Sequence, residues 1–329
     1  MCTSISFSRP ALFGRNLDLE VSFGERVVIT PRDYPFTFHN RPAPEHHFAM
    51  VGMASVAAGV PLYAEAMNEK GLYLAGLNFP GNAVYFPDGG TPGCVAPYEL
   101  IPLVLGTCAT LDEARALLKE LRIIGTPFAP QLPPAPLHWH IADATGSITA
   151  EPMEDGLRLW ENPAGVLTNN PPFPFHMMHL NAFQSLSPRQ PENTFAPSLA
   201  LHSYGQGMGA LGLPGDASPM SRFVRACFLK EHSVFTGDAD ENAMQFFRIL
   251  DAVAMVRGSV VTPEGKYDET IYSCCADADT LTYYYKTYSN GRPSAVRLSP
   301  EACTGRELRQ FAPDRRPDIL FADEKETFQ

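Results

Sequence analysis

The order of the predicted strands and helices is the feature that most constrains the fold of this 329-residue chain. The first hundred residues read as strands and tight turns, and the first convincing helix is predicted over residues 110–124. More strands follow, then two helices over residues 220–231 and 240–256, then a last pair of strands. Strands and helices that come in blocks favour antiparallel sheets covered by helices, whereas regular alternation would favour a parallel sheet.

Local patterns support this order. Thr110 and Glu113 form a capping box ahead of one apolar stripe, and Ser218 with Pro219 supplies an N-cap and a first-turn proline. Three hairpins are predicted, with paired strands at 62–66 and 72–78, at 137–143 and 147–152, and at 270–275 and 280–287. The sequence therefore predicts an α+β protein.

No repeat, low-complexity run or linker divides the sequence, so we expect a single domain over residues 1–329. The segment 188–215 is rich in proline and glycine and reads as a long irregular loop. Loops of this length are usually functional or form interfaces. We expect this loop to protrude and to make contacts between subunits.

The composition narrows the partners and the compartment. Twenty-five Lys and Arg against 36 Asp and Glu give a net charge of −11, which argues against nucleic acid or a membrane surface as the partner. The N-terminus lacks the basic and apolar regions of a signal peptide. The seven cysteines are scattered and odd in number, unlike a disulfide scaffold. We expect a cytoplasmic protein with reduced thiols.

Several catalytic signatures are missing from the sequence, including G-x-S-x-G, the phosphate-binding G-x-x-x-x-G-K-[ST] loop and H-E-x-x-H. His138 and His140 would share one face of a strand and could hold a metal. No cysteine or carboxylate with matching spacing lies nearby, so packed and hydrogen-bonded imidazoles are the better interpretation. We predict neither a metal nor a cofactor.

Cys2 is the residue with the most specific chemistry. Methionine before a small residue is normally trimmed, which would place a free α-amino group and a thiol on the same residue. The reference pKa values of the two groups are about 7.7–8.0 and about 8.5, so the amine can accept the thiol proton near neutral pH. Cys2 would then be both nucleophile and base. The alternative is an incidental small residue in the interior.

Arg15 and Asp18 stand three residues apart on a segment that could pair with the N-terminal strand. A guanidinium near Cys2 would favour the thiolate. A carboxylate could hold and orient the α-ammonium group. The alternative is an ordinary ion pair on the surface.

With these residues in place, the chain resembles the choloylglycine hydrolase family of N-terminal-nucleophile hydrolases, which contains the bile salt hydrolases and the penicillin V acylases. The resemblance extends from Met1 to about Tyr288. It rests on the N-terminal MCT and on the motifs FGRNLD (13–18), MNEKGL (67–72), AGLNFP (75–80), LHW (137–139), GVLTN (165–169), GLPGD (212–216), SRF (221–223) and VAMVRGS (253–259).

This resemblance implies an αββα sandwich of two antiparallel sheets and amide hydrolysis through a thioester on Cys2. It implies that Arg15 flanks the thiol and that Asp18 binds the α-amino group. Asn169 and the backbone N–H of Asn78 would stabilise the oxyanion. The remaining implied catalytic residue is Arg222. From the residues alone, Asn169 reads as a turn asparagine and Arg222 as an arginine on a helix surface.

Asn78 resembles the bile salt hydrolase version of its motif, whereas penicillin V acylases often carry tyrosine there. The implied substrate is a bile acid joined to glycine or taurine by an amide bond, and the implied assembly is a homotetramer. The residues expected to grip the steroid are Leu17, Ala64, Phe128, Leu132 and Leu137. Two alternatives stay open, namely an acylase for penicillin V or another N-acyl amide, and a non-catalytic amphiphile-binding protein that retains Met1.

Overall fold

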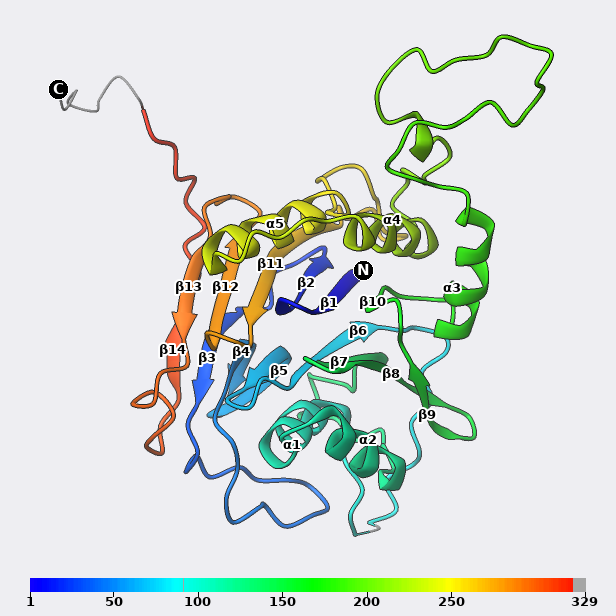
Figure 1. Cartoon of the computed structure of the whole chain (residues 1–329). Coiled ribbons are helices and arrows are strands. Elements are labelled where there is room, and N and C mark those ends of the chain that lie inside the picture. The colour runs from blue at the N-terminus through cyan, green and yellow to red at the C-terminus, as the bar shows by residue number, and fades with distance from the viewer. Residues whose placement is uncertain (91, 322–329) are drawn as a thin grey trace, which may run out of the picture.

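The computed structural model describes residues 1–90 and 92–321. Two antiparallel sheets lie face to face, and helices cover the outer face of each (Figure 1). One sheet is covered by α4 (Pro219–Glu231) and α5 (Ala239–Asp251), and the other by α1 (Leu100–Thr107) and α2 (Leu111–Glu120). The predicted α+β class and the four-layer αββα sandwich are therefore confirmed.

The six-stranded sheet carries the N-terminus. Its strand order is β10-β1-β2-β11-β12-β13, and every neighbouring pair is antiparallel. The strands are β1 (Cys2–Ser8), β2 (Ala11–Leu19), β10 (Val166–Leu167), β11 (Glu269–Asp277), β12 (Thr282–Thr287) and β13 (Ser294–Arg297). Because β1 lies inside this sheet, between β10 and β2, the start of the chain is held in the middle of the molecule (Figure 1).

The eight-stranded sheet has the order β14-β3-β4-β5-β6-β7-β8-β9 and is also antiparallel throughout. Its strands are β3 (Arg26–Thr30), β4 (Met50–Ala57), β5 (Val60–Asn68), β6 (Tyr73–Asn78), β7 (Leu137–Asp143), β8 (Gly146–Met153), β9 (Gly156–Glu161) and β14 (Arg309–Phe311). All three predicted hairpins are present, as β5–β6 and β7–β8 in this sheet and β11–β12 in the other.

The predicted helix starts are correct. The Thr110 side chain accepts the Glu113 amide at the start of α2 (Leu111–Glu120), and Ser218 caps α4 (Pro219–Glu231) in the same way. Asp238 caps α5 (Ala239–Asp251). Such caps satisfy backbone N–H groups that lack partners in the first turn.

Two predicted helix ends are too late. The first predicted helix ends at Glu120 rather than at residue 124, because Ile123 and Ile124 leave the helix and form parallel bridges to Val95 and Phe86. The third ends at Asp251 rather than at residue 256, where tight turns replace the helix. The apolar pattern of the sequence continues beyond both helix ends, so the pattern alone predicted helices that are too long.

Two helices, α1 (Leu100–Thr107) and α3 (Phe173–Leu180), are not predicted by the sequence pattern. Seven of the eight residues of α1 are buried, so it is apolar all round and shows no amphipathic period. The α3 segment follows two prolines and also reads as apolar without a stripe. Short helices of this kind are defined by tertiary packing rather than by local pattern.

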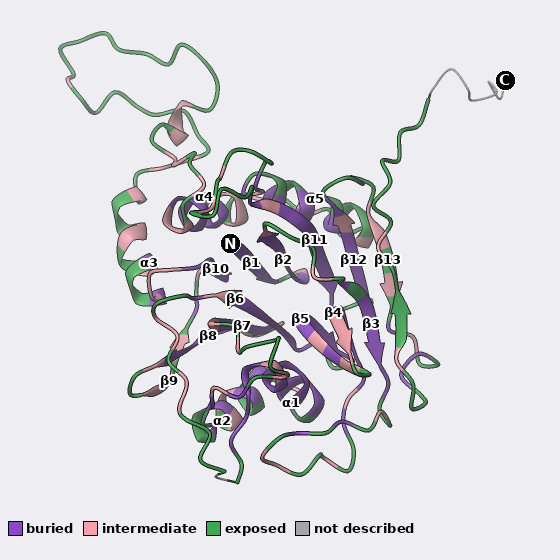
Figure 2. Cartoon of the chain, turned by 180° about the vertical axis from the view of Figure 1, so that it is seen from behind, coloured by how far each residue is buried: buried purple, intermediate pink, exposed green. Residues whose placement is uncertain are grey.

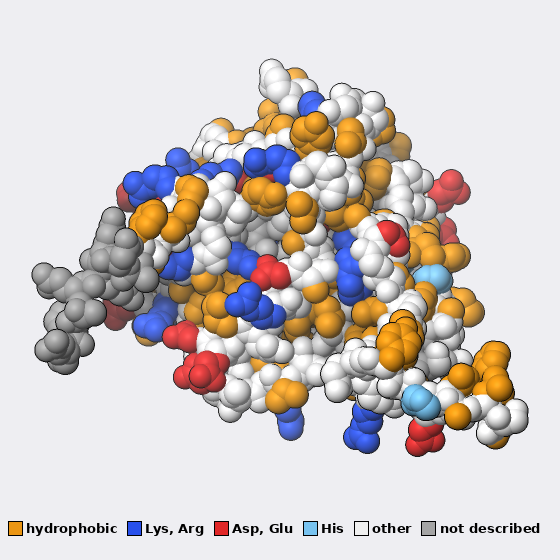
Figure 3. Space-filling view, turned by 90° about the horizontal axis from the view of Figure 1, so that it is seen from above, with side chains coloured by type: hydrophobic (Ala, Val, Ile, Leu, Met, Phe, Trp, Pro, Cys, Tyr) orange, Lys and Arg blue, Asp and Glu red, His pale blue; other side chains and the backbone are white. Residues whose placement is uncertain are grey.

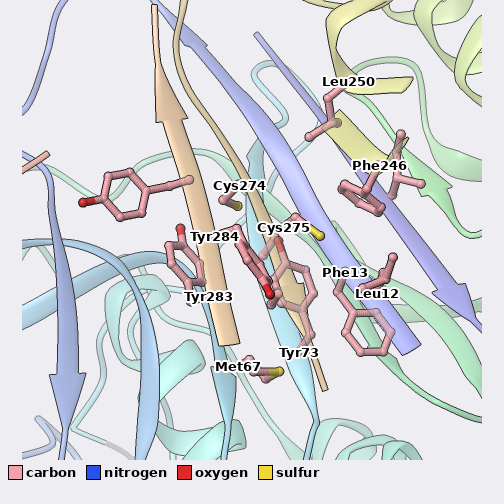
Figure 4. Packing of buried hydrophobic residues seen from close by; sticks show 14 of the residues in the cluster. Leu12, Phe13, Met67, Tyr73, Phe246, Leu250, Cys274, Cys275, Tyr283 and Tyr284 are labelled. Carbon is pink, nitrogen blue, oxygen red and sulfur yellow. The ribbon is translucent and has the colours of Figure 1, made fainter. Parts of the chain in front are cut away.

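The core between the two sheets is largely aromatic. The rings of Phe13 from β2 and Tyr73 from β6 stack with centroids 5.7 Å apart, which joins the sheets directly (Figure 4). Tyr283 from β12 points toward the same layer. Most strand residues are buried, whereas the helices expose their outer faces (Figure 2). The strands beside the N-terminus thus form a rigid support.

The segment 188–215 protrudes from the body beyond α3, as a mostly exposed loop (Figure 2). It contains the short 3-10 turn η3 (Met208–Ala210) and exposes Phe195 at 85% and Tyr204 at 89%. This loop lies on the right in Figure 1, and the view from above shows hydrophobic side chains at the surface on the same side (Figure 3). None of the helices in residues 1–90 and 92–321 is long and apolar enough to cross a membrane.

Candidate active site

Cys2 is the first residue of β1 and only 3% of it is exposed. Its neighbour across the ladder is Leu17, and Ser4 lies opposite Arg15. Side chains alternate along a strand, so the Cys2 and Arg15 side chains share one face of the sheet. That face is the inter-sheet layer, because Arg15 lies 3.7 Å from Glu65 on β5 of the other sheet. Alternation points Asp18 toward the helices instead.

Arg222 and Asn169 hold the backbone of the N-terminal strand. The Cys2 amide donates to Asn169 Oδ1 at 2.9 Å. Arg222, from α4, donates through Nη1 to the Cys2 carbonyl and to Thr3 Oγ1 and through Nη2 to Asn169 Oδ1 at 2.7 Å. Burial lowers the pKa of Arg222, and the charges of Asp18 and Cys2 oppose that effect. The sequence-based reading of Arg222 as a surface residue is wrong, because its side chain is fully buried.

Asn169 is fixed from several sides. Its Nδ2 donates to the Asn78 carbonyl at 2.8 Å, which leaves a second N–H on the same nitrogen. Its own carbonyl contacts His176 Nε2 at 2.9 Å, and the preceding carbonyl of Thr168 contacts His138 Nε2 at 3.0 Å. The interpretation of Asn169 as a turn asparagine therefore does not account for its main contacts. Asn169 and Asn78 meet at one end of β1, next to Cys2.

Arg15 spans the two sheets. Its Nη1 donates to the carbonyls of Gly76 at 2.5 Å and of Ala64 at 3.4 Å, whereas its buried Nη2 has no partner among the described residues. Burial lowers the pKa of the guanidinium, but the neighbouring Cys2, tyrosines and Glu65 outweigh it and raise the pKa above its usual range. Arg15 therefore stays charged beside the thiol and is not a surface ion pair.

Asp18 is completely buried on the other face of β2. Thr270 donates to its Oδ1 at 2.6 Å, whereas its Oδ2 has no partner within the described part of the chain. Burial raises the pKa of this carboxyl group, and Arg222, the N-terminal ammonium and Thr270 oppose the rise. The Met1 ammonium donates to the Asp18 carbonyl and lies 3.4 Å from Asp268 Oδ2. The chain start thus contacts the backbone carbonyl of Asp18 and one carboxylate, that of Asp268.

Sequence reasoning missed the residues that support this group. Glu65 is fully buried between the sheets and accepts hydrogen bonds from Tyr272 at 2.7 Å and Tyr283 at 2.6 Å. A glutamate in an alternating strand looks like a solvent-facing residue, so only the sheet stacking reveals its place. His138 pairs with the buried Glu151 at 3.3 Å, which confirms the hydrogen-bonded reading of that histidine.

The residues expected to bind substrate lie in two groups. Leu17 is buried beside Cys2, Ala64 offers its carbonyl to Arg15, and Leu137 packs over Gly76. The remaining two residues lie on the segment that leads into β7. Phe128 packs edge-on against Tyr98 with ring centroids 5.3 Å apart, and Leu132 is 45% exposed. The first group lies next to Cys2 and Arg15, whereas the aromatic contact of Phe128 is with Tyr98 rather than with a residue of the site.

Other surface cavities lie elsewhere. One of about 510 Å³ lies between α5 and the strands β12 and β13, and another of about 410 Å³ lies at the far end of β1. Neither is lined by Cys2 or Asn169. Within residues 1–90 and 92–321, no group of three or more His, Cys, Asp or Glu side chains is arranged to hold a metal ion. All seven cysteines are free and buried.

The two-sheet fold places the chain in the class of N-terminal-nucleophile hydrolases, and it brings Cys2, Arg15, Asp18, Asn169 and Arg222 close together. A family model described as linear amide C–N hydrolases, choloylglycine hydrolase family, matches residues 2–310. The chain belongs to the choloylglycine hydrolase family and is a hydrolase of linear amides.

Similar proteins are known from several bacteria. A bile salt hydrolase/transferase of Lactiplantibacillus plantarum is 44% identical over 94% of this chain and 95% of its own length. The corresponding protein of Clostridium perfringens is 35% identical over 94% of this chain and 96% of its own. The crystal structure of a cysteine-to-alanine variant of the conjugated bile acid hydrolase from Clostridium perfringens superposes with a TM-score of 0.87 at 34% identity, covering 98% of this chain and all of that one.

Proposed function

We propose that this protein hydrolyses the amide bond between a bile acid and glycine or taurine. The observation that carries the proposal is the similarity over nearly the whole chain to proteins named for bile salt hydrolysis, at up to 44% identity. The grouping of Cys2 with a buried arginine, a buried carboxylate and a braced asparagine supports it.

In the proposed mechanism, removal of Met1 converts the Cys2 amide nitrogen into an α-amino group. This amine takes the thiol proton, and the thiolate attacks the substrate carbonyl carbon. The resulting oxyanion accepts hydrogen bonds from the second N–H of Asn169 Nδ2 and from the Asn78 backbone N–H. One such donor lowers a barrier of this kind by about 3 kcal/mol.

Collapse of the tetrahedral intermediate breaks the C–N bond. The α-ammonium group gives its proton to the departing nitrogen, so glycine or taurine leaves as an amine and the bile acid remains as a thioester on Cys2. A water molecule then attacks the thioester, with the α-amino group again as base. Deacylation releases the free bile acid and restores the thiol.

The three buried charged residues have different roles in this mechanism. Arg15 lies on the thiol side of the strand and stabilises the thiolate. Asp18 lies on the helix side, where its unpartnered Oδ2 is available to the α-ammonium group. Arg222 fixes the Cys2 carbonyl and Asn169 relative to each other. No cofactor takes part in this sequence of steps.

A bile salt substrate suits a site in which apolar side chains lie next to charged catalytic residues. Leu17, Ala64 and Leu137 lie at the site, close to Cys2 and Arg15. We expect Phe128 and Leu132 to add further apolar contacts to the steroid. Burying a rigid steroid against such side chains yields about 25 cal/mol per Å². The anionic glycine or taurine would point away from this surface, toward solvent.

Acyl transfer is a second activity to test, because four of the similar proteins are named hydrolase/transferase. In that reaction an amine rather than water attacks the thioester and forms a new amide. The same site allows penicillin V acylase activity as the rival hydrolysis. A penicillin V acylase from Agrobacterium tumefaciens shares the fold with a TM-score of 0.72 at 18% identity.

The test compares kcat/KM for glycocholate, taurocholate and penicillin V on one preparation, with Cys2→Ala as the blank and intact mass to verify loss of Met1. We expect kcat/KM for the conjugated bile salts to exceed that for penicillin V by at least about tenfold, which corresponds to about 1.4 kcal/mol. A preference for penicillin V would overturn the substrate. Binding without turnover by a chain that retains Met1 would instead support the non-catalytic amphiphile-binding protein. A primary amine added at millimolar concentration would reveal transfer as a new amide.

We also propose a cytoplasmic homotetramer. The loop 188–215 exposes Phe195, Tyr204 and Leu211 far from the body, and exposed apolar groups of this kind are suited to contacts between subunits. The seven unpaired cysteines suit a reducing compartment. Light scattering of the parent chain and of a variant with the loop shortened tests the assembly, and a parent mass of one subunit would contradict it.

A further inference from the structure

Strand β11 departs from regular pairing directly beside the candidate site. Thr270 lies opposite Asp18, but the next paired residue is Tyr272, opposite Leu17, so Ile271 is an extra residue in β11. A bulge of this type redirects a side chain and is common next to active sites. Here the redirected side chain is that of Thr270, which is 5% exposed and points its hydroxyl at Asp18.

The Thr270 hydroxyl has a defined direction. The Met255 backbone N–H donates to Thr270 Oγ1 at 2.7 Å, so this oxygen is an acceptor there. Its single proton is therefore free for Asp18 Oδ1, 2.6 Å away. The Thr270 amide also donates to the Met255 carbonyl at 3.2 Å. Thr270 is thus clamped between the turns after α5 and the carboxyl group of Asp18.

The consequence for Asp18 is an asymmetric carboxylate. Oδ1 is occupied by Thr270, whereas Oδ2 is buried without a partner among the described residues. The charged groups that face Asp18 are Arg222 on α4, the Met1 ammonium before β1 and Asp268 before β11. On the other side of Thr270, the pair Lys286–Asp251 lines a cavity of about 200 Å³.

We propose that Thr270 is a positioning residue that fixes the Asp18 carboxyl group so that Oδ2 faces the α-amino group of trimmed Cys2. This inference rests on the proposed function. Burial raises the pKa of Asp18, and donation from Thr270 opposes the rise. Without the hydroxyl, Asp18 would take up a proton at higher pH and lose its hold on the α-ammonium group.

The central variant is Thr270→Val, which keeps the branched shape and removes only the hydroxyl. We expect kcat/KM at neutral pH to fall by at least about tenfold with KM nearly unchanged. The acid limb of the pH profile should move upward by about one unit, because Asp18 protonates more readily. Thr270→Ser keeps the hydroxyl and should recover activity to within a factor of two or three.

Thr287→Val is the matched control. Thr287 is also buried and lines the same cavity, but its hydroxyl donates to the Asp314 carbonyl at 3.2 Å and not to Asp18. This variant should keep the parent pH profile. If Thr270→Val does not fold, Thr270→Ala and Thr270→Ser replace the comparison, because they differ only in the hydroxyl.

A second readout separates this inference from the choice of substrate. The rate of Cys2 alkylation by iodoacetamide, followed by mass against pH, needs no bile salt. A shifted alkylation profile in Thr270→Val together with no bile salt turnover by the parent would uphold Thr270 and overturn the substrate. An unshifted profile, or a Thr270→Ser variant as impaired as Thr270→Val, would overturn the role of Thr270.

Discussion

Asn68, in the layer beneath α1, and the polar residues around Cys2 are all buried, yet their hydrogen bonding differs. Beneath α1, Asn68 is fully satisfied: its Nδ2 donates to two carbonyls, and its Oδ1 accepts from two amides. Around Cys2, by contrast, Arg15 Nη2, Asp18 Oδ2 and Asp268 Oδ1 have no partner among the described residues.

This difference distinguishes polar groups that stabilise the fold from polar groups that take part in the proposed reaction. A buried polar atom without a partner destabilises the folded state by about 1–3 kcal/mol, so such atoms are rare in layers that only support the fold. Around Cys2 they are the groups that the proposed α-ammonium, thiolate and substrate would meet. The layer beneath α1 supplies apolar packing, with Leu103, Val104 and Leu105 almost completely buried.

The largest expected effect contrasts two buried cysteines. Cys2→Ala should reduce turnover to the blank while leaving the free energy of unfolding nearly unchanged, because the nucleophile is lost and little volume is removed. Cys108→Ala, beneath α1, should keep kcat within about twofold. Steady-state rates and urea unfolding of both variants check this, and hydrolysis that persists in Cys2→Ala would remove Cys2 as the nucleophile.

Two asparagines provide the next contrast. Asn169→Ala should lower kcat by about 10²–10³ through loss of an oxyanion donor. Asn68→Ala should leave kcat nearly unchanged but lower the free energy of unfolding by about 2 kcal/mol, because four backbone groups lose their hydrogen-bond partner. Should Asn68→Ala lose activity as severely as Asn169→Ala, the separation between the two regions would be wrong.

The comparison also shows what the sequence could predict. Hairpins and capped helices depend on neighbouring residues, so β5–β6, β7–β8 and the starts of α2 and α4 follow from local pattern. Helix α1 does not, because its apolar residues are spread over all faces and only packing defines it.

The candidate site divides in the same manner. The position of Cys2 at the N-terminus is enough to predict its chemistry. The pairing of the first two strands is enough to predict that Arg15 and Asp18 lie near it. Asn169 and Arg222 entered through family resemblance alone. Glu65 and Thr270 escaped both routes, because their partners are more than 200 residues away in the sequence and one of them depends on a bulge.

The inter-sheet layer should also make stability depend on pH. Burial lowers the pKa of His140, between Ser4 and Ser6, to about 3. In the unfolded chain the same imidazole titrates near about 6.5. The unfolded state therefore binds more protons between these values, and the free energy of unfolding falls with decreasing pH by up to about 1.4 kcal/mol per unit.

The His140→Gln variant tests this contribution, since glutamine keeps a hydrogen-bonding side chain but does not titrate. Urea unfolding at several pH values between 4 and 7 should give a shallower slope for the variant than for the parent. The difference between the two slopes isolates His140 from the other buried groups. Equal slopes would show that His140 does not stay neutral in the folded chain.

The smallest expected effect lies at the rim of the site. Leu132 is 45% exposed, so Leu132→Ala removes apolar surface that a steroid would cover but little that the fold buries. We expect KM for glycocholate to rise about fivefold, equivalent to about 1 kcal/mol, with kcat and the free energy of unfolding unchanged. Leu103→Ala, on the buried face of α1, should show the reverse, with a loss of stability of about 2–5 kcal/mol and an unchanged KM. An unchanged KM in Leu132→Ala would mean that the steroid binds elsewhere on the approach to Cys2, and would transfer the role of apolar contact to Leu17 and Leu137.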